Sequence, residues 1–143
     1  MKSLLFTQSR LGLHRKPFTI FKFKTMVDGK VTRFGSILRA TGIDELPQLW
    51  NIVKGDMQFI GPRPLTQEDV DRLKWNSSEY DKRFSVRPGM TGFAQLSPIC
   101  DPKNTLTQDH KTIDEKSTLN ILKIILLSLA IAFLGKKIIK KFL

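Results

Sequence analysis

Two adjacent carboxylates, Asp44 and Glu45, are the residues of this sequence best suited to chemistry. They lie in the run from Thr41 to Asn51, in a chain of 143 residues with a formal net charge of +11. Acidic side chains among many cations suit a site for a divalent metal and a phosphorylated substrate. The ordinary alternative is that acids in a first helical turn complement the helix dipole. Their position alone leaves both interpretations open.

Several cations are placed where they could neutralise a phosphate. Lys22 and Lys24 alternate along a segment rich in aromatic residues, so in a strand they would share one face, opposite Phe21 and Phe23. That face could be an anion clamp or a solvated edge, and base rates for exposed charge favour the edge. Four arginines lie near the acids or near turns: Arg39, Arg63, Arg83 and Arg87. Arg63 could instead satisfy loop carbonyls, and Arg83 and Arg87 could face acidic lipid.

The elements that would position these residues begin with a predicted β-hairpin over residues 4–26, turning around Gly12–Pro17. Apolar residues at helical spacing then predict a short helix ending near Gly42: Val31, Phe34, Ile37 and Leu38. A second helix follows, in which Pro47 is tolerated only near the start. This places Asp44 and Glu45 in its first turn.

The second helix has an apolar stripe at the spacing of a buried face, and Gly55 ends it. The stripe consists of Leu46, Leu49, Trp50 and Val53. Residues 61–64 predict a rigid non-helical segment, and residues 66–83 a polar helix with a capping box from Thr66 to Asp69. We expect a turn over residues 87–92 and a loop over residues 97–104.

The C-terminal segment differs in composition from the rest. Residues 119–134 carry one charge, Lys123, and as a helix would rise ~24 Å, short of the ~30 Å hydrocarbon core. Residues 135–143 alternate basic and apolar pairs. This pattern favours a helix lying on or dipping into an anionic leaflet, with a buried core helix as the alternative. We therefore expect two parts, 1–118 and 119–143.

The fold class expected from these patterns is α+β, mostly helical, with an N-terminal β-hairpin and a peripheral attachment to a membrane. The single cysteine, Cys100, excludes an intrachain disulfide, and no Cys/His cluster has zinc spacing. The charge alone would permit nucleic-acid binding, but the chain has no nucleic-acid-binding motif. We therefore expect no nucleic acid among its partners.

Five ordered segments together carry a family resemblance. They are Phe21–Met26, Ile43–Asn51, Lys54–Met57, Gly61–Leu65 and Val86–Gly92. In this order they resemble the bacterial sugar transferase family, the monotopic polyprenyl-phosphate phosphoglycosyl transferases. The match covers roughly residues 4–96 well and the rest loosely.

The resemblance implies a reaction in which a UDP-sugar gives its sugar-1-phosphate to undecaprenyl phosphate and releases UMP. It implies that Asp44 is the nucleophile, that Glu45 helps to hold Mg²⁺, and that Lys24 and Arg39 are active-site cations. It also implies a location at the cytoplasmic face of the bacterial inner membrane, at the first membrane step of surface polysaccharide or glycoconjugate synthesis. The sugar is not identified, and homo-oligomerisation stays open.

Two departures from the family pattern motivate an alternative. Members usually begin with a hydrophobic re-entrant helix, whereas this sequence starts at the hairpin. The usual Gly-Arg-Asn after the Ala-Gln pair has no equivalent in the segment Leu96–Cys100. The alternative is therefore a truncated, inactive, membrane-bound accessory paralogue, while the C-terminal helix could otherwise take over membrane attachment.

Overall fold

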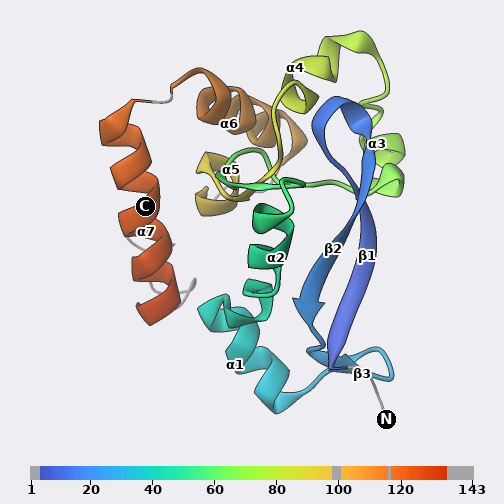
Figure 1. The fold of residues 1–143 in the computed structure, drawn as a ribbon, viewed down its shortest axis with the longest axis vertical. Helices are drawn as coiled ribbons and strands as arrows, with labels where there is room; N and C mark the ends of the chain where they lie inside the picture. The colour runs from blue at the N-terminus through green and yellow to red at the C-terminus, as the bar shows by residue number, and fades with distance from the viewer. Residues whose placement is uncertain (1–3, 98–100, 116, 135–143) are drawn as a thin grey trace.

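The computed structural model describes residues 4–97, 101–115 and 117–134, and it confirms the α+β class. A long hairpin forms one side of the molecule, a column of short helices lies beside it, and the C-terminal helix stands on the far side (Figure 1). About half of the chain is helical, which corrects the expectation of a mostly helical domain.

The predicted hairpin is present. Strand β1 (Leu5–Leu11) pairs with the antiparallel strand β2 (Pro17–Phe23), and the turn contains the 3-10 helix η1 (Leu13–Arg15). The register sets Phe6 opposite Lys22 and Arg10 opposite Phe18. Because directly opposed residues of an antiparallel pair project to the same face, Arg10 shares a face with Lys22.

A tight second hairpin follows and delays the first helix. Strands β3 (Met26–Val27) and β4 (Lys30–Val31) pair, so Val31 belongs to a strand and not to the predicted helix. Helix α1 (Arg33–Thr41) then starts at Thr32, whose hydroxyl accepts a hydrogen bond from the Gly35 amide at 2.9 Å. It ends at Gly42, whose φ of 77° is a left-handed cap that glycine favours.

The two carboxylates lie at the entry to the next helix, close to where the sequence predicts them. They occupy the 3-10 turn η2 (Ile43–Glu45), and Pro47 is the N-cap of helix α2 (Gln48–Val53). The acids are therefore in a separate turn that precedes α2 and not in its own first turn. Gly55, with φ 81°, follows the end of this helix as predicted.

The predicted buried stripe of α2 is wrong. Its apolar side chains are exposed, with Trp50 at 59% and Val53 at 77%, whereas Gln48 and Asn51 are buried. Leu46 and Leu49 are exposed as well. The inner face of α2 is thus polar, and the reason is the contact that this face makes with the hairpin.

Asn51 attaches α2 to the outer edge of β2. Its Nδ2 donates to the Thr19 carbonyl at 2.6 Å, and its Oδ1 accepts from the Phe21 amide at 3.3 Å. The Asn51 carbonyl also accepts from the amides of Asp56 and Met57. A side-chain amide therefore pairs with the edge of β2 as a neighbouring strand would, which no apolar residue could do.

The middle of the chain forms a small parallel sheet and a broken helical region. Strand β5 (Gln58–Ile60) pairs with β6 (Gly89–Thr91), so part of the predicted turn over 87–92 is a strand. The capping box of Thr66 and Asp69 is confirmed at the start of α3 (Gln67–Leu73). The helix predicted over 66–83 is nevertheless interrupted, because Lys74 adopts φ 58°. It is followed by η3 (Ser78–Tyr80) and α4 (Asp81–Phe84).

A buried ion pair joins α4 to helix α6 (Pro102–Asp114). Arg83 and Asp109 lie 2.7 Å apart, and their side chains are 2% and 0% exposed. Burial raises the pKa of the Asp109 carboxyl, and the Arg83 charge opposes that shift. Arg83 also donates to the Arg63 carbonyl at 2.8 Å. This arginine is a structural residue of the interior, in place of the predicted phosphate contact.

The adjacent apolar core holds α3 and α4 against the hairpin. It consists of Leu11, Val70, Trp75 and Phe84. The Arg83 guanidinium lies over the Trp75 and Phe84 rings, so the ion pair and this core share side chains.

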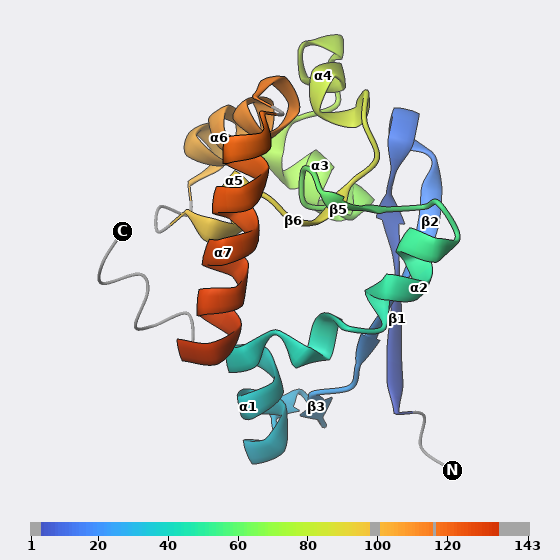
Figure 2. The ribbon, with the colours of Figure 1, turned by 60° about the vertical axis from the view of Figure 1, so that its left-hand side comes forward.

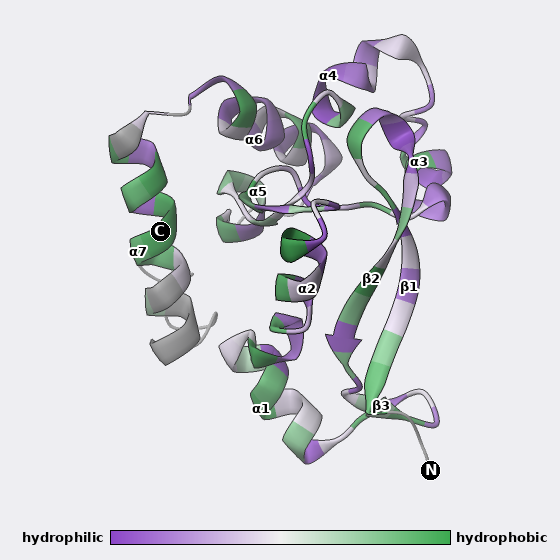
Figure 3. Ribbon diagram, viewed as in Figure 1, coloured by the Kyte–Doolittle hydropathy of each residue, from purple (hydrophilic) through white to green (hydrophobic). Residues whose placement is uncertain are grey.

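The C-terminal part contains α5 (Phe93–Leu96), α6 and the predicted apolar helix, α7 (Thr118–Leu134). Because α6 begins at Pro102, the end of the loop predicted over 97–104 is helical; residues 98–100 lie outside the described part. Figure 3 shows that α7 is mostly hydrophobic among its described residues. No helix within the described ranges is long and apolar enough to cross a bilayer. The basic segment 135–143 lies outside the described residues.

We expect Asn51→Ala to destabilise the protein. The substitution leaves the Phe21 amide and the Thr19 carbonyl without their partner, at a cost of about 1–3 kcal/mol. The control is Asn76→Ala, which removes the two hydrogen bonds of an exposed side chain, to Asp71 and from Gln67, and should change stability by less than about 0.5 kcal/mol. Chemical denaturation of the three proteins compares the two losses, and equal stabilities would contradict the role given to Asn51.

We also expect Asp109→Ala to cost about 3–5 kcal/mol, because it leaves the buried Arg83 charge uncompensated. Asp114→Ala on the same helix is the matched control. It removes an exposed ion pair with Lys82, which should contribute less than about 1 kcal/mol. The measurement is again the free energy of unfolding. A loss at Asp109 no larger than that at Asp114 would show that the buried pair does not stabilise this fold.

Candidate functional site

A cavity of about 1350 Å³ is lined by residues of the hairpin, the α1–η2 segment, the β5–β6 pair and α7. Figure 2 shows how these elements are arranged in space. Six of the eight residues predicted to form the site line it: Asp44, Glu45, Lys22, Lys24, Arg39 and Arg63. The volume exceeds the roughly 300–1,000 Å³ of ordinary small-molecule pockets. The cavity therefore has room for more than one ligand.

The carboxylate pair lies on one wall. Asp44 and Glu45 are both half-buried, and Glu45 Oε1 accepts from Lys22 Nζ at 2.9 Å. Lys22 comes from β2, which Asn51 ties to α2, so a single interface fixes the distance between this cation and the acid. The Lys22 side chain is therefore held in an ion pair in the cavity lining and is not freely solvated.

Arg39 and Lys24 lie along the same wall. Arg39 Nε donates to the buried Thr25 hydroxyl at 2.8 Å, which attaches the end of α1 to the segment after β2. Lys24 is exposed and lies one residue beyond β2. Since the strand ends at Phe23, the expected alternation is incomplete, and Phe23 lines the cavity together with both lysines.

Arg63 is presented by the Pro62–Pro64 segment, as the sequence predicts. Its side chain is exposed into the cavity, while its carbonyl accepts from Arg83. The backbone around the arginine is thus fixed by two prolines and a buried ion pair. The flanking prolines could be read from the sequence, whereas the Arg83–Asp109 pair could not.

Arg10 is a cation of this site that the sequence analysis missed. It lines both the large cavity and a smaller pocket beside it, which it shares with Lys22, Glu45 and Arg63. Burial lowers the pKa of Arg10, and the nearby Arg63 charge lowers it further, while Asp69 and Glu45 oppose this. Its charge is held by Asp69, 3.5 Å away, and by the Pro64 carbonyl at 3.2 Å. Arg10 could have been predicted only from the register of the hairpin, which puts it on the same face as Lys22.

Gln95 is a second residue that the sequence analysis did not assign to the site. It lines both pockets, and its Oε1 is buried without a hydrogen-bond partner among the described residues. A buried acceptor of this kind can receive an N–H or O–H group of a ligand. The Ala94-Gln95 pair was visible only as part of the family resemblance.

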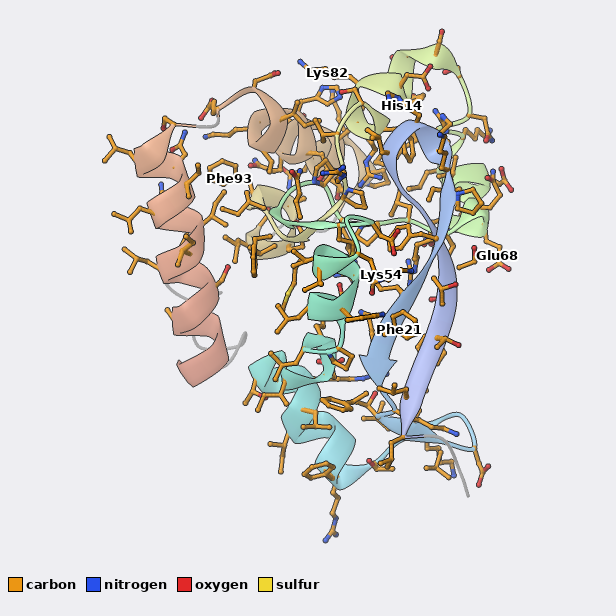
Figure 4. All side chains as sticks on the ribbon, viewed as in Figure 1. His14, Phe21, Lys54, Glu68, Lys82 and Phe93 are labelled. Atoms are coloured by element: carbon orange, nitrogen blue, oxygen red, sulfur yellow. The ribbon has the colours of Figure 1, made fainter. Side chains whose placement is uncertain are left out.

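The two remaining predicted cations do not reach the cavity. Arg83 is buried beside Asp109, and Arg87 is exposed outside the lining, where its carbonyl accepts from Gln58 at 2.7 Å. Charged side chains such as Glu68 and Lys82 lie at the periphery of the molecule (Figure 4). The cations that line the cavity are therefore only a small part of the total positive charge of the protein.

The carboxylate pair also fits a magnesium ion. Among the described residues, no three His, Cys, Asp or Glu side chains gather as a metal cluster. Magnesium is commonly bound by one or two carboxylates, with waters and substrate phosphates completing its shell. Asp44 and Glu45 on a cavity wall rich in cations match that donor set. The arrangement as a whole suits phosphoryl-transfer chemistry, in which charge on a phosphate must be neutralised.

Known proteins with similar sequences agree with this interpretation. The family profile described as bacterial sugar transferase matches residues 1–135. A UDP-glucose:undecaprenyl-phosphate glucose-1-phosphate transferase of Caulobacter vibrioides is 44% identical over 64% of this chain and 40% of its own length. The galactosyl transferase CpsE of Streptococcus agalactiae is 33% identical over 92% of this chain and 35% of its own.

A third relative is the UDP-N-acetylgalactosamine-undecaprenyl-phosphate N-acetylgalactosaminephosphotransferase of Aeromonas hydrophila, 39% identical over 65% of this chain and 25% of its own. The chain thus matches between 25% and 40% of the length of these relatives. The family profile covers all of the described residues, and with them the carboxylate pair and its cations. The chain belongs to the bacterial sugar transferase family.

Proposed function

We propose that this protein is a phosphoglycosyl transferase that moves a sugar-1-phosphate from a UDP-sugar to undecaprenyl phosphate. The observation that carries the proposal is the single cavity that Asp44 and Glu45 line together with Lys22, Lys24, Arg39 and Arg63. Relatives named for this transfer support the choice of substrates. The proposed location is the cytoplasmic face of the bacterial inner membrane.

The proposed mechanism has two steps at Asp44. In the first, a carboxylate oxygen of Asp44 attacks the β-phosphorus of the UDP-sugar, the bond to the bridging oxygen breaks, and UMP leaves with that oxygen. In the second, a phosphate oxygen of undecaprenyl phosphate attacks the same phosphorus and the Asp44 carboxylate is released. The product is the diphosphate-linked sugar on the lipid. Such a covalent intermediate predicts ping-pong kinetics.

The cations of the cavity would make this attack feasible. A carboxylate approaching a diphosphate meets charge repulsion, which Lys24, Arg39 and Arg63 can offset in a site partly shielded from water. Glu45 would help to hold Mg²⁺, which when bound supplies neutralisation of the diphosphate charge. Lys22, paired with Glu45, would then hold that acid in place for the metal.

The membrane is proposed to contact the exposed apolar surface of α1, η2, α2 and β5. This surface comprises Phe34, Ile37, Ile43, Leu46, Leu49, Trp50, Val53 and Phe59. Large exposed apolar side chains in this number on four successive elements suggest an interaction surface, and Trp is well suited to a lipid–water interface. The net charge of +11 would favour an anionic leaflet.

Asp44→Asn tests the transferase and its nucleophile together. Removing the attacking oxygen's charge should lower UMP release by at least about 10³-fold, as for other covalent nucleophiles. UMP release is measured with UDP-glucose, UDP-galactose and UDP-N-acetylgalactosamine, and Asp71→Asn, on exposed α3, is the matched control. Turnover retained by Asp44→Asn would remove Asp44 as nucleophile. A wild-type chain that binds these donors but transfers nothing would favour the inactive accessory protein.

Trp50→Ser combined with Val53→Ser tests the membrane surface. Both side chains are exposed, so the double variant should keep its thermal stability while its partition onto anionic vesicles falls about tenfold or more. Sedimentation with vesicles containing phosphatidylglycerol measures the partition. Unchanged sedimentation would exclude this surface as the membrane contact.

A further inference from the structure

The cavity has a charged wall and an apolar wall, and the proposed donor accounts only for the first. The apolar wall is formed by side chains of η2, of Leu46 directly after it, of β5 and of α7. Its members include Ile43, Leu46, Phe59, Ile60, Ile121 and Ile125. A UDP-sugar offers little apolar surface beyond its uracil ring, so it would use only a few of these residues. The cavity volume of about 1350 Å³ also leaves space beside a nucleotide sugar.

Helix α7 is fixed so that one of its faces stays open to the cavity. Ile124 is buried and anchors the helix, and the Ser128 hydroxyl lies 2.8 Å from the Thr91 hydroxyl of β6. Ile121 and Ile125, one turn apart, line the cavity and remain partly exposed. We call these two residues the α7 face. Leu119, Leu122 and Leu126 of this helix are exposed as well, so the α7 face is distinguished by lining the cavity.

The apolar wall continues to the outside of the molecule. Ile43, Leu46 and Phe59 line the cavity and also belong to the exposed apolar surface described above. A hydrocarbon chain could therefore contact apolar side chains both on that surface and inside the cavity, where Ile43 and Leu46 flank the Asp44–Glu45 pair in the sequence. Figure 2 shows α7 on the opposite side of the molecule from α2 and the hairpin.

We infer that the α7 face, with Leu46 and Phe59, is the subsite for the isoprenoid chain of the acceptor lipid phosphate. The inference rests on the proposed function and adds the place of the acceptor within the site. A ligand with one phosphate at the end of a branched hydrocarbon chain complements both walls at once. Its phosphate lies at the cationic end, where Arg63 and Lys24 are exposed, and its chain lies against α7.

The test compares acceptors that differ only in chain length, in detergent micelles so that bilayer binding does not contribute. Undecaprenyl phosphate is compared with geranyl phosphate in the full chain and in Ile121→Asn and Ile125→Asn. The matched control is Leu122→Asn, because Leu122 lies on the same helix at 52% exposure, close to the 42% of Ile125, but does not line the cavity.

We expect the two cavity variants to raise the KM for undecaprenyl phosphate about tenfold, while KM for geranyl phosphate and for the UDP-sugar changes less than about twofold. Leu122→Asn should change none of these values. An unchanged KM for undecaprenyl phosphate, or an equal rise for both acceptors, would overturn the inference. Weaker vesicle binding by the Ile variants with no KM change in micelles would also overturn it, and would make the α7 face a membrane contact.

UMP release in the absence of acceptor distinguishes a failure of the proposed function from a failure of the acceptor subsite. It reports attack on the donor alone and does not involve the acceptor chain. A wild-type protein that releases no UMP with any of the three donors contradicts the proposed function. A wild-type protein that releases UMP but shows no chain-length effect in the Ile variants contradicts only the acceptor subsite.

Discussion

The site depends on one side-chain amide. Asn51 pairs with the edge of β2 through Thr19 and Phe21, and this contact sets α2 against the hairpin. The carboxylates precede α2, and Lys22 and Lys24 lie at the end of β2 and just after it. The position of the acids relative to these cations therefore depends on the Asn51 contact. Because the amide both donates and accepts, it matches the alternating groups of a strand edge. A hydrophobic contact would hold the two elements together but would not fix their register in this way.

A second buried polar contact does the same for the other side of the cavity. Arg83, neutralised by Asp109, holds the Arg63 carbonyl, and Gly61 lies so close to Gly89 that a Cβ on Gly89 would approach the Gly61 nitrogen to 2.0 Å. The β5–β6 pair can therefore form only with glycine at position 89. Both walls are thus positioned by specific polar or steric contacts, and the apolar core beside them contributes stability more than placement.

The sequence predicts what depends on local chemistry. The hairpin, the capping box at Thr66 and the helical break at Gly55 all follow from residues close to one another in the chain. The strand at Gly89 was missed because its partner lies about thirty residues earlier. Arg10 and Arg83 were misjudged for a related reason: the register of β1 and the partner on α6 are long-range facts. The carboxylate pair was identified through the order of its motifs, since its position alone suited helix capping equally well.

The error on α2 concerns which solvent the helix faces. A stripe at i, i+3, i+4 and i+7 predicts a buried face only if the other face meets water. In α2 the interior contact is polar, and the apolar stripe of Leu46, Leu49, Trp50 and Val53 is outside. In water that exposure would be unfavourable, whereas beside lipid it would be favourable. The predicted helical spacing of the apolar residues is therefore correct, but they lie on the exposed face of the helix and not on the buried one. The inner, polar residues of such a helix are the ones that report its packing, and here they are the residues that hold the site together.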